Sequence, residues 1–196
     1  MVKALMGFYI IIRGPAGSGK SAVASGLAKE LNARCIHFDD ILAKHKLDKI
    51  EGSGISTENF IKGDELVVDG IRELLERGQI VIIDACFYRR GHIAHLINSL
   101  PFRHYVFSLE ASTEECIRRN KLRGNGLTWS TERIPTGGTE EAPEGQYGIF
   151  RSRTLEEKDI RDVHALVSRL KVGVPIETGG KGVDDVIRDI KSRLSF

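Results

Sequence analysis

The hydrophobic residues of this chain alternate between two spacings along most of its length. Short, nearly continuous apolar runs predict buried strands at residues 8–13, 34–38, 80–83, 104–109 and 175–178. Apolar residues three and four positions apart predict helices at residues 22–31, 59–77, 92–100, 112–123, 155–170 and 183–194. Strands that alternate with helices predict an α/β fold, in which helices cover both faces of a parallel sheet.

The most apolar run, Ile-Val-Ile-Ile at residues 80–83, is typical of a central parallel strand that is buried on both faces. Right-handed crossover connections bring the carboxyl ends of such strands to one edge of the sheet, where ligands bind. We therefore expect the functional residues among those that directly follow the predicted strands.

The segment from residue 124 to residue 153 breaks this alternation. Its first part, 124–148, is rich in glycine and carries almost no periodicity, and Arg123, Arg151 and Arg153 flank it. A long structureless stretch inside a compact domain is usually a lid, a binding loop or a disordered segment. We interpret 124–153 as a mobile lid inserted into a single domain of residues 1–196, with a passive insertion as the alternative.

The composition bears on the number of domains, the cellular compartment and the kinds of partner to expect. A chain of 196 residues can bury one full core, and its 29 basic and 27 acidic side chains argue neither for nor against nucleic acid. Cys35, Cys86 and Cys116 lack any C-x-x-C spacing, which favours reduced thiols in a cytoplasmic protein. Apolar runs stay well below the roughly 20 residues that span a bilayer, so we expect no membrane partner.

The clearest motif is Gly-Pro-Ala-Gly-Ser-Gly-Lys-Ser at residues 14–21, which matches G-x-x-x-x-G-K-S between a predicted strand and a predicted helix. Its glycines allow successive main-chain N–H groups to converge on phosphates, and the helix N-terminus adds partial positive charge. Lys20 is expected to reach the β- and γ-phosphates and Ser21 to ligate Mg²⁺. The expected nucleotide-binding residues are Gly14, Ala16, Gly17, Ser18, Gly19, Lys20 and Ser21.

Carboxylates follow two of the predicted strands. Asp84 comes directly after the most apolar strand, where it can hold Mg²⁺ through water or, alternatively, cap the next turn. Asp39 and Asp40 follow the second strand, and one of them can act as the base that orients an acceptor hydroxyl. The other can cap a helix that begins at Ile41, or both can simply face solvent.

Two pairs of arginines are candidates for binding phosphates or the acceptor, and one pair of histidines must be considered as metal ligands. Arg119 and Arg123 share a face of the predicted helix before the lid, where they can cover a triphosphate or be solvated. Arg89 and Arg90 follow Asp84 closely, so they can bind an acidic or phosphorylated acceptor or pair with surface acids. His92 and His95 lack a third metal ligand nearby in the sequence, so we interpret them as ordinary core or surface histidines.

Together these residues resemble a group of P-loop kinases that includes phage-type 5′-polynucleotide kinase, zeta-toxin-like kinases and related small-molecule kinases. The resemblance covers residues 8–124 and rests on the 14–21 motif, Asp39-Asp40, Asp84 and residues 113–124, which contain Arg-Asn-x-x-Arg. It implies the three-layer P-loop NTPase fold, with a parallel five-stranded sheet in the order 2-3-1-4-5.

The resemblance also implies roles for individual residues. Asp39 corresponds to the general base, Arg123 to the lid arginine on the phosphates, and Arg119 to a position near the adenine or the phosphates. The chain departs from the polynucleotide kinase pattern at Leu42, where those enzymes tend to carry an arginine for the acceptor phosphate. It departs again at residues 84–87 (Asp-Ala-Cys-Phe) and in a longer lid.

These departures concern the acceptor and leave the nucleotide residues intact. The sequence therefore predicts a cytoplasmic, Mg²⁺-dependent ATP kinase that phosphorylates a hydroxyl of a small metabolite or nucleotide-like substrate, as a monomer or homodimer. A 5′-hydroxyl polynucleotide kinase is the first alternative, although nucleic acid is not favoured. A nucleotide-binding switch is the second, but a switch does not need Asp39 and Asp40.

Overall fold

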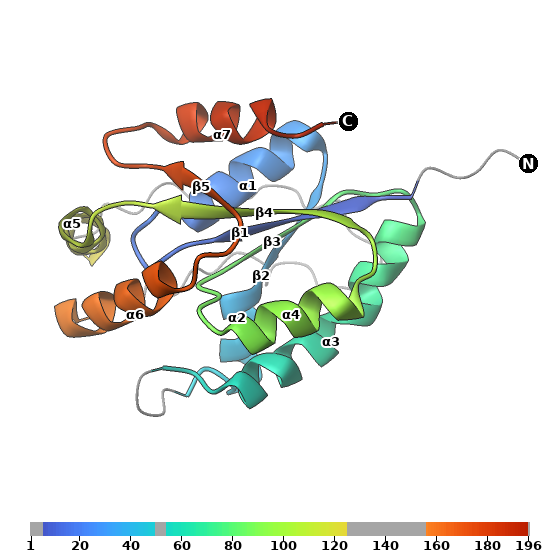
Figure 1. The fold of residues 1–196 in the computed structure, drawn as a ribbon, viewed down its shortest axis with the longest axis horizontal. Helices are drawn as coiled ribbons and strands as arrows, with labels where there is room; N and C mark the ends of the chain where they lie inside the picture. The colour runs from blue at the N-terminus through green and yellow to red at the C-terminus, as the bar shows by residue number, and fades with distance from the viewer. Residues whose placement is uncertain (1–5, 50–53, 125–155, 196) are drawn as a thin grey trace, which may run out of the picture.

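The strands of this protein form one parallel sheet in the order β2-β3-β1-β4-β5 (Figure 1). The structure is a computed structural model, and it describes residues 6–49, 54–124 and 156–195. The strands are β1 (Phe8–Arg13), β2 (Arg34–His37), β3 (Val81–Ala85), β4 (Arg103–Glu110) and β5 (Val174–Glu177). The helices are α1 (Lys20–Leu31), α2 (Phe38–Lys44), α3 (Thr57–Glu76), α4 (Arg90–Ser99), α5 (Thr113–Gly124), α6 (Glu157–Arg169) and α7 (Val183–Ser192). This sheet order confirms the one that the family resemblance implies.

Successive side chains of the central strands point to opposite faces of the sheet, so the core is divided into two parts. Ile10 and Ile12 of β1 pack with α1 and α7, whereas Tyr9 and Ile11 face the side of α2, α3, α4 and α6. Figure 1 shows α1 and α7 above the sheet and α2, α3 and α4 below it. Because β1 and β3 are buried on both faces, they are apolar nearly throughout. The three-layer α/β prediction is confirmed.

Two predicted boundaries are wrong near the candidate site. The second strand ends at His37, and α2 begins at Phe38 rather than at Ile41, so Asp39 and Asp40 lie in the first helical turn. Neither carboxylate is the N-cap of this helix, which is His37. Both carboxylates nevertheless lie where the helix dipole favours negative charge. Phe38 is fully buried in the core, which explains why an apolar strand pattern continues into the helix.

The lid interpretation concerns residues that the structure does not describe. Of the segment 124–153, only Gly124 is described, as the last residue of α5, so the lid stays a prediction. Within the described ranges, every helix is too short or too polar to cross a membrane.

A buried arginine connects the base of the phosphate loop to distant segments. Arg13, the last residue of β1, is 1% exposed. Its guanidinium donates hydrogen bonds to the carbonyl of Phe87 at 3.0 Å and to Ser108 Oγ at 2.9 Å. It also donates to the carbonyls of Val167 and Leu170 at the end of α6, both at 2.9 Å. Burial lowers the pKa of Arg13 to about 10, so the group is charged at neutral pH. The carbonyls at the end of α6 carry the partial negative charge that this cation needs.

Candidate active site

The loop between β1 and α1 has the backbone that the phosphate-binding motif requires. Gly17 and Gly19 adopt φ of +85° and +89°, in the left-handed region that favours glycine. A Cβ on Gly17 would lie 2.4 Å from the carbonyl oxygen of Cys116 in α5, so this position has no room for a side chain. Gly17 therefore allows α5 to pack directly against the loop, and Gly19 allows the positive φ that the loop needs.

The same loop contains a polar group that needs a partner. Ser18 is fully buried, and its Oγ has no hydrogen-bond partner among the described residues. A buried hydroxyl without a partner costs free energy, and a bound phosphate oxygen next to the loop would satisfy it. Lys20 is the first residue of α1, so the main-chain N–H groups of this helix start lie at the loop as well. The residues present fit a nucleoside triphosphate.

Ser21 and Asp84 form the pair that would hold Mg²⁺. Ser21 Oγ donates a 2.6 Å hydrogen bond to Asp84 Oδ2, and Asp84 is 2% exposed. Asp84 lies within β3, in register with Ile12 of β1 and His37 of β2, rather than after the strand as the sequence predicts. A hydroxyl and a carboxylate side by side at the phosphate loop fit a magnesium ion, which prefers oxygen ligands.

His37 is a site residue that the sequence analysis missed. Its Nδ1 lies 2.5 Å from Asp84 Oδ1, so both oxygens of this carboxylate are engaged. Burial alone would lower the pKa of His37, but hydrogen bonds to Asp84 and Cys35 outweigh it and raise that pKa to about 11. The only sequence signal is its place at the end of a strand next to the strand of Asp84, and pairing of those strands cannot be read from spacing.

Asp39 lies beside the phosphate-loop lysine. Its Oδ2 is 3.6 Å from Lys20 Nζ, and its side chain is 44% exposed. Partial removal from water raises the pKa of Asp39 above its ordinary value, while the Lys20 ammonium opposes that rise. Asp40, one residue on, is exposed. The ion pair therefore puts Asp39 next to the lysine of the phosphate loop, and its role as a base stays a prediction.

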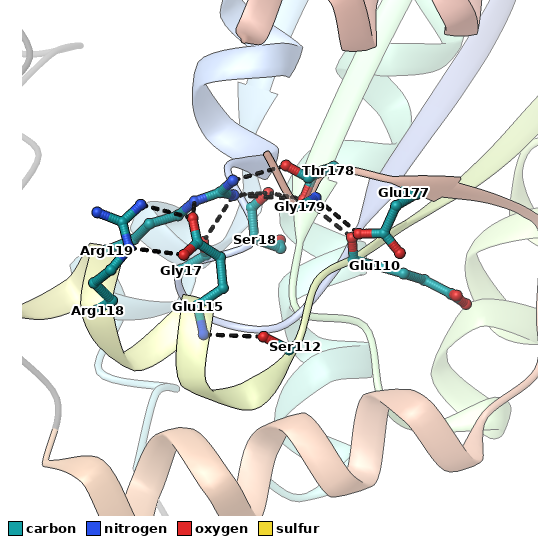
Figure 2. A network of polar contacts seen from close by, with 10 residues as sticks. All are labelled: Gly17, Ser18, Glu110, Ser112, Glu115, Arg118, Arg119, Glu177, Thr178 and Gly179. Carbon is teal, nitrogen blue, oxygen red and sulfur yellow. Dashed lines mark hydrogen bonds and ion pairs between the residues drawn. The ribbon is translucent and has the colours of Figure 1, made fainter. Parts of the chain in front are cut away.

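Arg119 lies against the phosphate loop rather than pointing to solvent (Figure 2). Its Nη1 lies 3.5 Å from the carbonyl oxygen of Gly17 and 3.4 Å from that of Ser18, and its Nη2 donates to the Thr178 carbonyl at 2.7 Å. Glu115 accepts from Arg119 Nε at 2.6 Å, and also from Arg118. These hydrogen bonds, that of Arg118 first, lower the pKa of Glu115 to about 2. Arg119 thus orders the loop through its carbonyl groups.

Thr178, directly after β5, is a second residue that the sequence analysis missed. It is 2% exposed, and its Oγ1 lies 3.1 Å from the carbonyl oxygens of both Ser18 and Glu110, which share its single proton. Figure 2 shows this hydroxyl next to Arg119 and the phosphate loop. The loop after β5 is thereby joined to the phosphate loop, 160 residues earlier in the chain.

Arg89 and Arg90 occupy different environments at the start of α4. Arg89 donates from Nε to the Ile55 carbonyl at 3.3 Å and lies over the ring of Tyr88, with its Cζ 5.4 Å from the ring centroid. The Tyr88 hydroxyl accepts the main-chain N–H of Ile55 at 2.6 Å. Arg90 is exposed. Arg89 therefore anchors the start of α3, and binding of an acceptor by these arginines stays a prediction.

Three residues form a polar cluster between α3, which carries Asp64, and α4, which carries His92 and His95. Asp64 of α3 is fully buried, and its two oxygens lie 2.9 Å from His92 Nε2 and 2.9 Å from His95 Nδ1. The His92 ring stacks on Phe60 at 4.5 Å, and its Nδ1 has no partner among the described residues. His92 is thus a core histidine, as the sequence predicts, and Asp64 is the partner that sequence reasoning missed.

Two other positions named in the sequence analysis are Leu42 and Arg123, and the structure describes the side chain of the first only. Leu42 is fully buried, and a Cβ on Gly63 of α3 would lie 2.6 Å from its Cδ2, so it belongs to the core. Arg123 lies in the last turn of α5, and its side chain lies outside the described residues. Its role on the phosphates stays a prediction.

Known proteins resemble this chain in sequence and fold. Residues 10–132 match the AAA domain family, which is more than half of the chain. A cytidylate kinase from Phytoplasma mali (strain AT) is 27% identical over 187 residues, with 86% of this chain and 72% of that protein covered.

Two solved kinases share the fold over nearly the whole chain. A sugar kinase from Janibacter sp. HTCC2649 superimposes with a TM-score of 0.66 at 14% identity, covering 95% of this chain and 93% of that one. The APS kinase of Mycobacterium tuberculosis, solved with AMPPNP and APS, gives a TM-score of 0.61 at 16% identity, covering 95% and 96%. The chain therefore belongs to the AAA domain family and has the fold of the P-loop kinases.

Proposed function

We propose that this protein is a Mg²⁺-dependent ATP kinase that phosphorylates a hydroxyl group of a small metabolite or nucleotide-like substrate. The carrying observation is the juxtaposition of two pairs at the sheet edge, Ser21 with Asp84 and Lys20 with Asp39. The first pair supplies oxygen ligands for a magnesium ion, and the second places a carboxylate next to the lysine of the phosphate loop. A protein that only binds or hydrolyses nucleotide does not need that second carboxylate.

The phosphate loop and its supports would hold the nucleotide. Main-chain N–H groups of residues 16–21 and the ammonium of Lys20 would bind the phosphates, with Ser18 Oγ available as a further donor. Ser21 and Asp84 would position Mg²⁺, which supplies charge neutralisation between the phosphates. Arg119 contacts the carbonyl oxygens of Gly17 and Ser18 and would keep these carbonyls away from the phosphates.

Asp39 would serve as the base for the acceptor hydroxyl. In the structure its carboxylate faces Lys20 at 3.6 Å. When Lys20 turns to the phosphates, the carboxylate becomes available to orient the acceptor hydroxyl and take its proton. Transfer in line then needs positioning and charge stabilisation more than covalent help from the protein.

The proposal also concerns the chemical class of the acceptor. Leu42 is buried in the core at the position where polynucleotide kinases tend to present an arginine for a phosphate of the acceptor, which disfavours a polynucleotide acceptor. Arg89 is engaged with Ile55 and Tyr88, and the exposed Arg90 is left to bind an anionic group on the acceptor. A small hydroxyl compound fits these observations better than an oligonucleotide.

The test follows labelled phosphate from ATP in the presence of Mg²⁺. The full chain is offered 5′-hydroxyl oligonucleotides, nucleosides, nucleoside monophosphates and a fractionated metabolite extract in parallel, with Lys20→Ala as the inactive control. Label in a metabolite or nucleotide fraction supports the proposal and identifies the acceptor by mass. Label on oligonucleotide ends would replace it with the polynucleotide kinase function. ATP binding without transfer to any acceptor would favour a nucleotide-binding switch.

A further inference from the structure

The side of His37 that faces away from Asp84 meets a thiol. Cys35 and His37 are two residues apart on β2, so their side chains lie on the same face of the strand. His37 is in register with Asp84 on the neighbouring strand β3. One donor atom from each of these three residues lies within 4.8 Å of the others. A thiol, an imidazole and a carboxylate are the three side-chain groups that bind zinc in proteins.

The distance between the thiol and the imidazole fits one shared metal ion. Cys35 Sγ lies 3.7 Å from His37 Nε2. In a tetrahedral zinc site, bonds of about 2.3 Å to sulfur and about 2.0 Å to nitrogen place these two ligand atoms about 3.5 Å apart. Ser25 Oγ of α1 lies 3.4 Å from the same nitrogen. The distance between the thiol and the imidazole therefore already matches that of two ligands on one ion.

The opposite edge of the imidazole is held as it is in metal-binding histidines. Nδ1 of His37 lies 2.5 Å from Asp84 Oδ1, and this hydrogen bond fixes the ring so that Nε2 faces Cys35. Histidines that bind metals commonly donate their other ring N–H to a carboxylate, which orients the ring and increases its basicity. Asp84 supplies that carboxylate from the next strand.

We propose that Cys35 and His37, backed by Asp84, form a binding site for a thiophilic divalent cation such as Zn²⁺. On binding, the cation replaces the thiol proton of Cys35 and the Nε2 proton of His37, and both protons go to solvent. The Nδ1 proton stays on its hydrogen bond to Asp84. Water or Ser25 Oγ completes the coordination.

The donor atoms make this site selective for ions that bind sulfur and nitrogen. Cys35 offers a sulfur and His37 a nitrogen 3.7 Å away, which Zn²⁺ and Co²⁺ bind tightly. Mg²⁺ prefers oxygen ligands instead. The site is therefore chemically distinct from the Ser21–Asp84 pair, although it adjoins that pair through Asp84.

The test uses Co²⁺ as a spectroscopic probe on the full chain without nucleotide, reduced with a phosphine. We expect one equivalent of Co²⁺ to give a near-ultraviolet thiolate-to-cobalt charge-transfer band, which Zn²⁺ then removes by displacement. Cys35→Ala should abolish the band and weaken Zn²⁺ binding by at least about tenfold. Cys86→Ala and Cys116→Ser are matched controls that remove the other two thiols, and both should keep the band.

Several results would overturn the proposal. A folded wild-type protein that gives no thiolate band has no such site, and a band that survives in Cys35→Ala but is lost in Cys86→Ala belongs to another cysteine. If Cys35→Ala does not fold, X-ray absorption of the zinc-loaded wild type decides. One sulfur at about 2.3 Å supports the site, and a shell without sulfur contradicts it.

Occupation of this site has a consequence that rests on the proposed kinase function. Because Asp84 would then support two cations, Zn²⁺ should inhibit phosphoryl transfer, and wild type should be more sensitive than Cys35→Ala when each is compared with its own zinc-free rate. The spectroscopic readouts do not depend on kinase activity. A protein that binds cobalt but transfers no phosphate therefore fails only the proposed function.

Discussion

Around the phosphate loop, the ordering contacts are polar side chains on main-chain carbonyls, whereas between α3 and α4 they are stacked rings next to one buried carboxylate. On the phosphate side, which we define as residues 14–21, α5 and the loop after β5, Arg119 and Thr178 bind the carbonyls of the loop. On the acceptor side, defined as α2, α3, α4 and the loop after β3, Phe60 stacks on His92, and His92 hydrogen-bonds to Asp64. The two sides meet at Lys20 and Asp39.

This difference has a physical reason. A triphosphate is the same in every nucleotide, so the phosphate side needs only a fixed backbone and charges that hold it. The acceptor side must fit one compound, and a close-packed apolar core holds a shape more strictly than exposed charges do. The acceptor side also carries Asp64 and His92, which are fully buried and depend on each other because water is absent.

The largest effect is expected where the two sides meet. Asp39→Asn removes the carboxylate that would take the acceptor proton, so kcat should fall by about 10²–10⁴-fold, the range for losing a general base. Affinity for ATP should be retained, because the loop residues and Ser21 are unchanged. Rapid-quench measurement of phosphoryl transfer, together with calorimetric titration of ATP, separates the two quantities.

Asp40→Asn is the matched control for that variant. Asp40 neighbours Asp39 in the same helical turn but is exposed, so its kcat should stay within about threefold of wild type. A large loss in Asp40→Asn with little loss in Asp39→Asn would transfer the role of base to Asp40.

The next effect concerns the stability of the acceptor side. Asp64→Ala leaves His92 with both ring nitrogens unpartnered in the core and removes the partner of His95. The free energy of unfolding should fall by about 3 kcal/mol, since a buried carboxyl group and its two hydrogen bonds are lost. Denaturant titration measures this change.

Asp69→Ala, on the same helix, is the control for Asp64→Ala. Asp69 pairs with Arg72 at the surface, with 86% of its side chain exposed, so its loss should cost less than about 1 kcal/mol. Equal losses in the two variants would contradict the view that the polar cluster holds the acceptor side together.

A smaller effect is expected for Arg119 on the phosphate side. Arg119→Ala removes the hydrogen bonds that order the carbonyls of Gly17, Ser18 and Thr178, so KM for ATP should rise by about 10- to 100-fold. Arg118→Ala is the control, because Arg118 contacts the same Glu115 but points to solvent. Its KM should stay within about twofold of wild type. Steady-state kinetics at saturating acceptor measure both, and equal changes would rule out ordering of the loop by Arg119.

The sequence predicts those site residues that belong to one contiguous motif or directly follow a recognisable strand. The 14–21 motif, Lys20, Ser21 and Asp84 follow from one contiguous pattern and from the end of an apolar strand. The layers follow from periodicity, while the sheet order came from the family resemblance. The start of α2 was wrong because buried Phe38 extends the strand pattern into a helix.

The missed residues act through partners that are distant in the chain. His37 meets Asp84 across two strands, Thr178 meets Ser18 from the other end of the chain, and Asp64 meets His92 across two helices. Sequence spacing carries no information on such pairs, because strand pairing and helix packing bring them together. The lid and the role of Arg123 stay predictions, since they concern residues or side chains outside the described part of the chain.

The smallest effects are expected when the same serine-to-alanine change is made at one helix N-cap on each side. Ser56 caps α3 on the acceptor side by accepting from the Asn59 N–H, and Ser112 caps α5 on the phosphate side by accepting from the Glu115 N–H, both at 3.1 Å. Each serine-to-alanine change should lower the free energy of unfolding by about 1 kcal/mol. Because α5 carries Arg119, Ser112→Ala should also raise KM for ATP about two- to threefold, whereas Ser56→Ala should leave it unchanged and raise only KM for the acceptor. If both variants change KM for ATP equally, the two sides are not independent, and the contrast between them fails.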